Sequence, residues 1–211
     1  MKSGTAREDL EKQLRDSILP GALDVNIMTK CDRTNYDENG EALSAEYSDA
    51  MAALRGFALS TCNSSVVFSA GMNPRLYAYC EQFNDFFPDS KGKLKKKIIL
   101  KVSDFRSASI QGKFLAKKGL WISEFRIESG LNCGGHAFAT DGLLLGPILE
   151  EFKMKRTQLT EELFAICNSA LAERGKTLFE HIPEVRITVQ GGIGTYQEDK
   201  FLRDFYSLDG T

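Results

Sequence analysis

Leu120-Trp121-Ile122-Ser123-Glu124-Phe125-Arg126-Ile127 is an apolar run that leads into the glycine-rich segment Ser129-Gly130-Leu131-Asn132-Cys133-Gly134-Gly135-His136. A second strand-like run, Val185–Val189, ends in Gln190-Gly191-Gly192-Ile193-Gly194-Thr195. The carboxyl ends of parallel strands meet at one edge of a sheet. Two glycine-rich loops after two successive strands therefore predict one shared site at that edge.

Three further strand-like runs precede these two, and helical segments alternate with them. The strands are predicted at Leu23–Met28, Ser65–Ser69 and Lys97–Val102. Helices are predicted at residues 5–17, 45–59, 74–86, 106–118, 143–152, 159–173 and 197–206. Strands that alternate with helices indicate an α/β fold with a parallel sheet, either a TIM barrel or a doubly wound sheet.

The composition is that of a globular protein, and it excludes several functional classes. Of the 211 residues, 42% are hydrophobic and 27% are charged, which is typical of a folded domain over residues 1–211. A net charge of −2 predicts no nucleic-acid partner. No apolar run approaches the roughly 20 residues that span a bilayer, so no membrane partner is predicted. The N-terminal residues lack the apolar core of a signal peptide, and the 5 cysteines are widely spaced. Both features favour reduced thiols and a cytoplasmic location.

Three short segments together resemble the nitronate monooxygenase family, whose members are FMN-dependent TIM-barrel enzymes related to flavin enoyl reductases. The family has a strand that ends in Gln-Gly-x-Glu-Ala-Gly-Gly-His, where this chain has Ser129–His136. Its next strand ends in Ala-Ala-Gly-Gly-Ile, where this chain has Val189–Ile193. Its upstream Gly-Val-Asn-Leu is similar to Asp24–Ile27. The resemblance extends over about residues 5 to 205.

The resemblance implies a (β/α)8 TIM-barrel fold of which this sequence carries about five of the eight strands. The chain is then expected to be a single FMN-type barrel domain that is truncated at both ends. Because an open barrel exposes two sheet edges, we expect a homo-oligomer or a partner chain that covers them.

The resemblance also implies roles for individual residues. His136 would be the catalytic base, since an imidazole titrates near neutrality and can take the acidic proton of a nitroalkane. Gly191 and Gly192 would offer backbone amides to the FMN phosphate, and Lys101 would face the N1/O2 edge of the flavin ring. The complete set of residues implied to bind the cofactor is Asn26, Lys101, Ser129, Gly134, Gly135, Gly191 and Gly192.

Each of these residues also has a simpler interpretation, which the sequence leaves open. His136 can be a packed loop residue, Lys101 an ordinary strand-end lysine, and the paired glycines a tight turn with positive φ. Cys133 lies three residues before His136 and is interpreted as a packed thiol. No metal site is predicted, because no second cluster of cysteine and histidine accompanies it. Ser129 and Asn132 replace the family's glutamine and glutamate, which affects flavin contacts and substrate choice.

The reaction implied by the resemblance is the oxidation of an alkyl nitronate with O2, with FMN bound non-covalently. Two alternatives stay open. One is an NAD(P)H-dependent flavin reductase of the enoyl-reductase type, and the other is a non-catalytic fragment or partner subunit without a cofactor. Flavin absorbance in the purified protein separates both enzymes from the third case, and bleaching by NAD(P)H separates the two enzymes.

Overall fold

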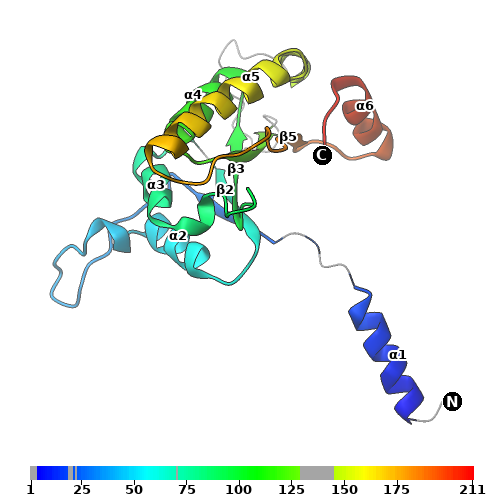
Figure 1. The fold of residues 1–211 in the computed structure, drawn as a ribbon, viewed down its shortest axis with the longest axis horizontal. Helices are drawn as coiled ribbons and strands as arrows, with labels where there is room; N and C mark the ends of the chain where they lie inside the picture. The colour runs from blue at the N-terminus through cyan, green and yellow to red at the C-terminus, as the bar shows by residue number, and fades with distance from the viewer. Residues whose placement is uncertain (1–3, 19–20, 22, 70, 129–144) are drawn as a thin grey trace.

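The computed structural model describes residues 4–18, 21, 23–69, 71–128 and 145–211, which form an α/β fold around one five-stranded sheet (Figure 1). The strands are β1 (Asp24–Met28), β2 (Ser64–Ser69), β3 (Lys96–Val102), β4 (Ile122–Glu128) and β5 (Arg186–Gln190). All neighbouring strands are parallel, and their order in the sheet is their order in the sequence. A doubly wound sheet reverses its strand order at a switch point. The observed order has no reversal and is compatible with part of a TIM-type sheet.

The predicted α/β alternation is confirmed, and all five predicted strands are present with small differences at their ends. The helices are α1 (Gly4–Asp16), α2 (Asp49–Leu59), α3 (Pro74–Tyr79), α4 (Phe105–Ala116), α5 (Leu145–Glu173) and α6 (Tyr196–Tyr206). Short 3₁₀ turns lie at Ala45–Tyr47, Cys80–Gln82 and Asn84–Phe86. The predicted helix at residues 74–86 is therefore shorter than expected, because α3 ends at Tyr79 and two of these turns follow.

α5 is longer than predicted. One continuous helix of 29 residues replaces the two helices expected at residues 143–152 and 159–173. Residues 153–158 contain no glycine or proline and are mostly exposed. They continue the helix through their own propensity and add no buried side chain to the core. The gap in the apolar pattern is thus an exposed stretch of helix and not a loop.

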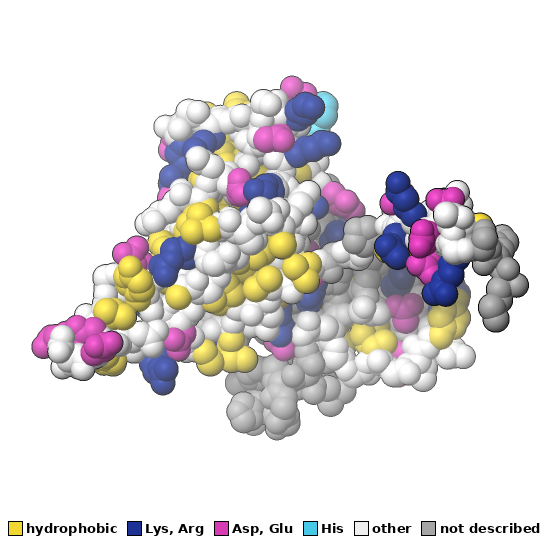
Figure 2. Space-filling view, turned by 90° about the horizontal axis from the view of Figure 1, so that it is seen from below, with side chains coloured by type: hydrophobic (Ala, Val, Ile, Leu, Met, Phe, Trp, Pro, Cys, Tyr) yellow, Lys and Arg dark blue, Asp and Glu magenta, His cyan; other side chains and the backbone are white. Residues whose placement is uncertain are grey.

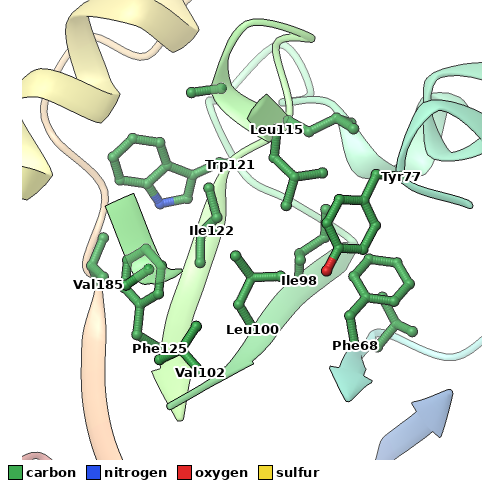
Figure 3. Packing of buried hydrophobic residues seen from close by; sticks show 14 of the residues in the cluster. Phe68, Tyr77, Ile98, Leu100, Val102, Leu115, Trp121, Ile122, Phe125 and Val185 are labelled. Carbon is green, nitrogen blue, oxygen red and sulfur yellow. The ribbon is translucent and has the colours of Figure 1, made fainter. Parts of the chain in front are cut away.

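One face of the sheet is buried beneath the helices. Along β3, the alternate residues Ile98, Leu100 and Val102 point to this face and belong to the hydrophobic core. Figure 3 shows these side chains beside Leu115 of α4 and Tyr77 of α3. Burying a large apolar side chain of this kind contributes about 1.5–3 kcal/mol, so this layer fixes how the helices lie on the sheet.

Trp121 is the single tryptophan of the chain and lies immediately before β4. It is 2% exposed, and its ring centroid lies 6.4 Å from that of Phe164 in α5. On its other side, the ring of Phe179 lies 5.7 Å away. The indole therefore packs between the long helix and the loop that leads into β5, and it ties both to the start of β4.

The opposite face of the sheet is polar. Its buried apolar members are Val67 and Ile99, at 3% exposure each. The polar side chains on this face are Asp24, Asn26, Ser65, Ser69, Lys97, Lys101, Glu124, Arg126, Glu128, Arg186, Thr188 and Gln190. The interior of a TIM barrel is usually filled by valine, isoleucine and leucine. This face therefore differs from an ordinary barrel interior, and we refer to it as the polar face.

The sheet is curved toward its polar face. Arg126 on β4 reaches Asp24 on β1 with 3.4 Å between Nη2 and Oδ2. In a flat sheet these two strands lie about 14 Å apart. The two residues are also offset by about 13 Å along the strands, since Asp24 is level with Lys97 of β3 whereas Arg126 pairs with Lys101. Their side chains cannot cover that diagonal in a flat sheet, so the strands must be tilted and coiled toward each other.

The last residues of the chain pair with the free edge of β5. Ser207 ends α6 in the left-handed conformation at φ 55° and turns the chain back toward the sheet. The amide of Asp209 donates to the carbonyl of Ile187 at 2.8 Å, and Gly210 forms a parallel bridge with Thr188. These residues extend the sequential strand order by one position beyond β5.

The outer surface mixes both signs of charge. Figure 2 shows basic and acidic side chains interspersed with hydrophobic ones on the face seen from below. α1 has no buried residue and stands away from the sheet (Figure 1). Within the residues that the structure describes, no helix combines the length and the apolar character that crossing a membrane requires.

Candidate functional site

The candidate site lies at the carboxyl edge of the sheet, where β4 and β5 end side by side. Glu128, the last residue of β4, is in register with Gln190, the last residue of β5. The two glycine-rich loops therefore leave the sheet from adjacent strands, as the sequence predicts. His136 lies outside the described residues, as do three of the residues expected to bind the flavin, namely Ser129, Gly134 and Gly135.

Gly191 and Gly192 form a sharp turn directly after β5. Their φ angles are 95° and 75°, in the left-handed region that residues with a Cβ atom rarely occupy. The turn therefore requires glycine at both positions. This geometry agrees with the simpler interpretation of the two glycines as a tight turn, and it also brings backbone close to any group bound at this edge.

The N-terminus of α6 follows this turn and is closed by its own side chains. Glu198 Oε2 accepts hydrogen bonds from the amides of Gly194 at 3.0 Å and Thr195 at 2.9 Å. The Thr195 hydroxyl in turn accepts from the Glu198 amide, which completes a capping box. These bonds, the one from Gly194 foremost, hold the pKa of the Glu198 carboxyl below its usual value. A phosphate at this helix end would have to displace a carboxylate or use the amides before Gly194.

Lys101 lies near the carboxyl end of β3, where the sequence predicts it. Its ammonium group pairs with Glu128 Oε1 at 2.8 Å, and the two side chains are only 14% and 19% exposed. Both residues alternate with core positions of their strands and therefore belong to the polar face. The sequence prediction missed Glu128. Glu124, Arg126 and Glu128 alternate with apolar residues along the strand, which is a signal for one charged face. The prediction treated the whole run as apolar and therefore overlooked this alternation.

A second cluster of charges lies deeper on the polar face. Glu124 is 3% exposed, and its carboxylate contacts Arg126 Nε at 2.8 Å. It also accepts a hydrogen bond from the Thr188 hydroxyl at 2.7 Å and lies 3.4 Å from Arg186. Burial lowers the pKa of Arg126, but the bonds to Glu124 and Asp24 outweigh it and raise that pKa above its usual value. The cluster is internally neutralised and stabilises the curvature of the sheet.

Asn26 is exposed on β1, in register with Val67 of β2. β1 and β5 form opposite ends of the strand order. The structure therefore does not bring Asn26 beside Gly191 and Gly192 through strand pairing. A ligand that contacts both would have to reach across the concave polar face.

The loops after β1 and β2 are joined by hydrogen bonds at the carboxyl edge. The Thr29 hydroxyl donates to the carbonyl of Ser69 at 2.8 Å. Asp32 accepts from Arg75 at 2.7 Å and from Asn73 at 3.4 Å. Burial raises the pKa of Asp32, but these hydrogen bonds outweigh it and leave the pKa below its usual value. These hydrogen bonds hold the two loops together on the β1 and β2 side of the carboxyl edge.

The described residues do not supply a metal centre at this edge. No group of three or more histidine, cysteine, aspartate or glutamate side chains among them is arranged to hold a metal ion. A cavity of about 580 Å³ lies near the amino ends of the strands, between residues 63, 84–95 and 175–177. It is remote from the strand ends where α/β proteins bind ligands, so we do not assign it to the site.

The chain was compared with protein-family models, curated proteins and solved structures. It matches no protein-family model, no curated protein and no solved structure. The arguments for its function therefore depend on the residues and their geometry.

Proposed function

We propose that the chain is an FMN-dependent oxidoreductase similar to nitronate monooxygenases, which oxidises an alkyl nitronate with O2. The observation that carries this proposal is the register of Glu128 with Gln190, since it starts both glycine-rich loops from one edge of the sheet. Ligands of parallel α/β sheets bind at that edge. In this proposal the sheet is part of a (β/α)8 barrel with about five of its eight strands, in a single domain located in the cytoplasm.

The residues at the edge fit a flavin mononucleotide in part. The turn at Gly191 and Gly192 allows close approach of a phosphate to the backbone, and Lys101 supplies a cation for the electron-rich edge of the ring. Ser129, Gly134 and Gly135 would contact the ring, and Asn26 would contact it from β1. When bound, the flavin would supply the redox chemistry, and His136 would remove the α-proton of the parent nitroalkane to give the nitronate that is oxidised.

Two observations favour a second candidate function, a non-catalytic partner chain without a cofactor. Glu198 already bonds the amides that a phosphate at the α6 N-terminus would use. In addition, β1 has no strand partner on its outer edge among the described residues. A second copy or a covering chain would shield such an edge from aggregation.

Purification of the protein tests the proposal first. The expected result is a yellow protein with flavin absorbance bands, and a colourless protein that takes up no FMN would support the partner chain instead. The variant His136→Asn is expected to keep its FMN and to lose about 10²–10⁴-fold in the oxidation of 2-nitropropane, whose α-proton a base must remove, because general-base catalysis contributes that much. Oxygen consumption with 2-nitropropane measures the loss.

The chain offers a matched control in its only other histidine. His181 is exposed in the loop before β5, so His181→Asn is expected to leave both flavin content and oxidation rate unchanged. Equal rates in wild type and His136→Asn would remove His136 from the mechanism.

A further inference from the structure

The Lys101–Glu128 pair occupies a position that folding does not require. A shielded ion pair loses much of its Coulomb energy to desolvation and is often no better than two apolar residues. β3 and β4 are already joined by their backbone ladder and by the apolar layer on the other face. A charged pair that is largely shielded from water and lies at the ligand-binding edge is therefore better explained by a ligand than by stability.

The neighbours of the pair define the chemistry of the position. Ser69 ends β2 on one side of Lys101, and Gln190 ends β5 beside Glu128. At or next to their carboxyl ends, four adjacent strands thus carry a hydroxyl, an ammonium, a carboxylate and an amide on the polar face. Among the described residues, these four positions present polar side chains, which suit a small polar ligand better than a long acyl chain.

We propose that Lys101 binds a small planar oxyanion and that Glu128 competes with this ligand as the intramolecular partner of the Lys101 ammonium group. An ammonium group has three donors, and the bond to Glu128 uses one of them. A nitronate or a carboxylate offers two coplanar oxygens that accept such bonds. The inference rests on the proposed function for the nitronate, and it disfavours the acyl substrates of enoyl reductases.

A second planar anion has the chemistry that Lys101 would bind, namely the N1–C2 edge of a reduced flavin. Titrating small oxyanions and FMN in separate experiments distinguishes these two ligands. Acetate and propane-2-nitronate are titrated by calorimetry into protein freed of flavin, and FMN is titrated separately. Far-UV circular dichroism and thermal unfolding check that each variant is folded.

The two variants are expected to change the affinity for acetate in opposite directions. Lys101→Met loses the anchor and is expected to weaken binding about ten-fold or more, as for other hydrogen bonds to charged groups. Glu128→Gln removes the competing carboxylate and is expected to tighten binding. If the ion pair were only structural, both variants would be less stable and both would show the same change in acetate affinity. Lys97→Met is the control, since Lys97 is exposed on the same strand and face but at the other end.

The outcomes distinguish this inference from the proposed function. Anion binding through Lys101 in a protein that takes up no FMN would retain the inference and remove the flavin enzyme. A flavoprotein in which Lys101→Met and Lys97→Met bind acetate and nitronate equally well would overturn the inference alone. Loss of FMN affinity with unchanged acetate affinity would assign the anchor to the flavin and overturn the small-oxyanion assignment.

Discussion

Lys96 is fully buried at the start of β3, at 0% exposure, and forms no ion pair with another described residue. Its ammonium group donates to the Ser60 hydroxyl at 2.7 Å and to the Cys62 carbonyl at 2.6 Å. The ring of Phe57 lies 4.5 Å from the nitrogen. The end of α2 and an aromatic face thus take the place of a carboxylate, because cations are stabilised at helix C-termini and over aromatic rings.

Burial lowers the pKa of Lys96 from its usual value, so the fold disfavours the charged form. Below the folded-state pKa, Lys96 is protonated in both the folded and the unfolded chain, and the folded state is destabilised by the full cost of burying the charged amine. Between that pKa and about 10.4, the unfolded chain binds more protons. We therefore expect the free energy of unfolding to rise with pH in this window, relative to a variant that lacks the amine.

Lys96→Met is that variant, and urea unfolding at several alkaline pH values measures the difference. The substitution also leaves the Cys62 carbonyl without its donor, so a loss of about 1–3 kcal/mol is expected at neutral pH. The loss should grow as the pH rises through the window between the folded pKa and about 10.4, because only wild type gains stability there. Lys97→Met, at the exposed neighbouring position, should show neither effect. A difference between wild type and Lys96→Met that stays constant with pH would contradict the argument.

At the scale of elements, hydrophobic pattern predicted the strands well because each strand buries one face in the same core. It failed for α5, where the exposed middle of a long helix has no apolar periodicity to reveal it. The pattern also located Lys101 at a strand end, since strand ends follow from strand positions. It did not find Glu128, because the alternation of charged and apolar residues along β4 was overlooked. The partner of Glu128 depends in addition on the register of β3 and β4, which local sequence does not contain. His136, Ser129, Gly134 and Gly135 stay predictions.

α6 provides a prediction about its own N-terminus. Glu198→Gln replaces the carboxylate that closes this helix end with a neutral amide. Because a helix N-terminus attracts anions, the variant is expected to bind inorganic phosphate several-fold more tightly than wild type. Phosphorus NMR line broadening measures the affinity.

Asp204→Asn is the control, since it removes the same charge at the other end of α6. The Glu198 effect should also depend on pH in wild type. Its lowered pKa keeps the carboxylate ionised at neutral pH, so phosphate competes poorly there and better only as the pH falls through the folded pKa. Equal phosphate affinity in wild type and both variants would show that the cap does not block this end.

At the scale of the whole molecule, the bond between Asp24 and Arg126 holds the edge strand in a curved sheet. Both side chains are partly exposed, at 29% and 23%, so the ion pair contributes about 0.5–1 kcal/mol. Asp24→Asn is therefore expected to speed hydrogen exchange at the β1 amides about three-fold while leaving β3 unchanged. Mass spectrometry of the exchanged peptides measures both strands in one sample.

Asp9→Asn is the matched control, because Asp9 is exposed on α1, which packs on nothing in the described structure. Unchanged exchange in β1 after Asp24→Asn would mean that the backbone ladder to β2 alone determines the shape of the sheet. Equal acceleration in β1 and β3 would mean that the variant lowers global stability and does not act on the edge.

The position of Trp121 makes the molecule its own optical reporter. When excited by ultraviolet light, this single indole emits fluorescence from one known place, between the long helix and the entry to the last strand of the sheet. A red shift in its emission would record water arriving at that junction, and an unchanged spectrum would mean that the junction has stayed dry. Every variant above can therefore be screened for damage at the core without attaching a dye.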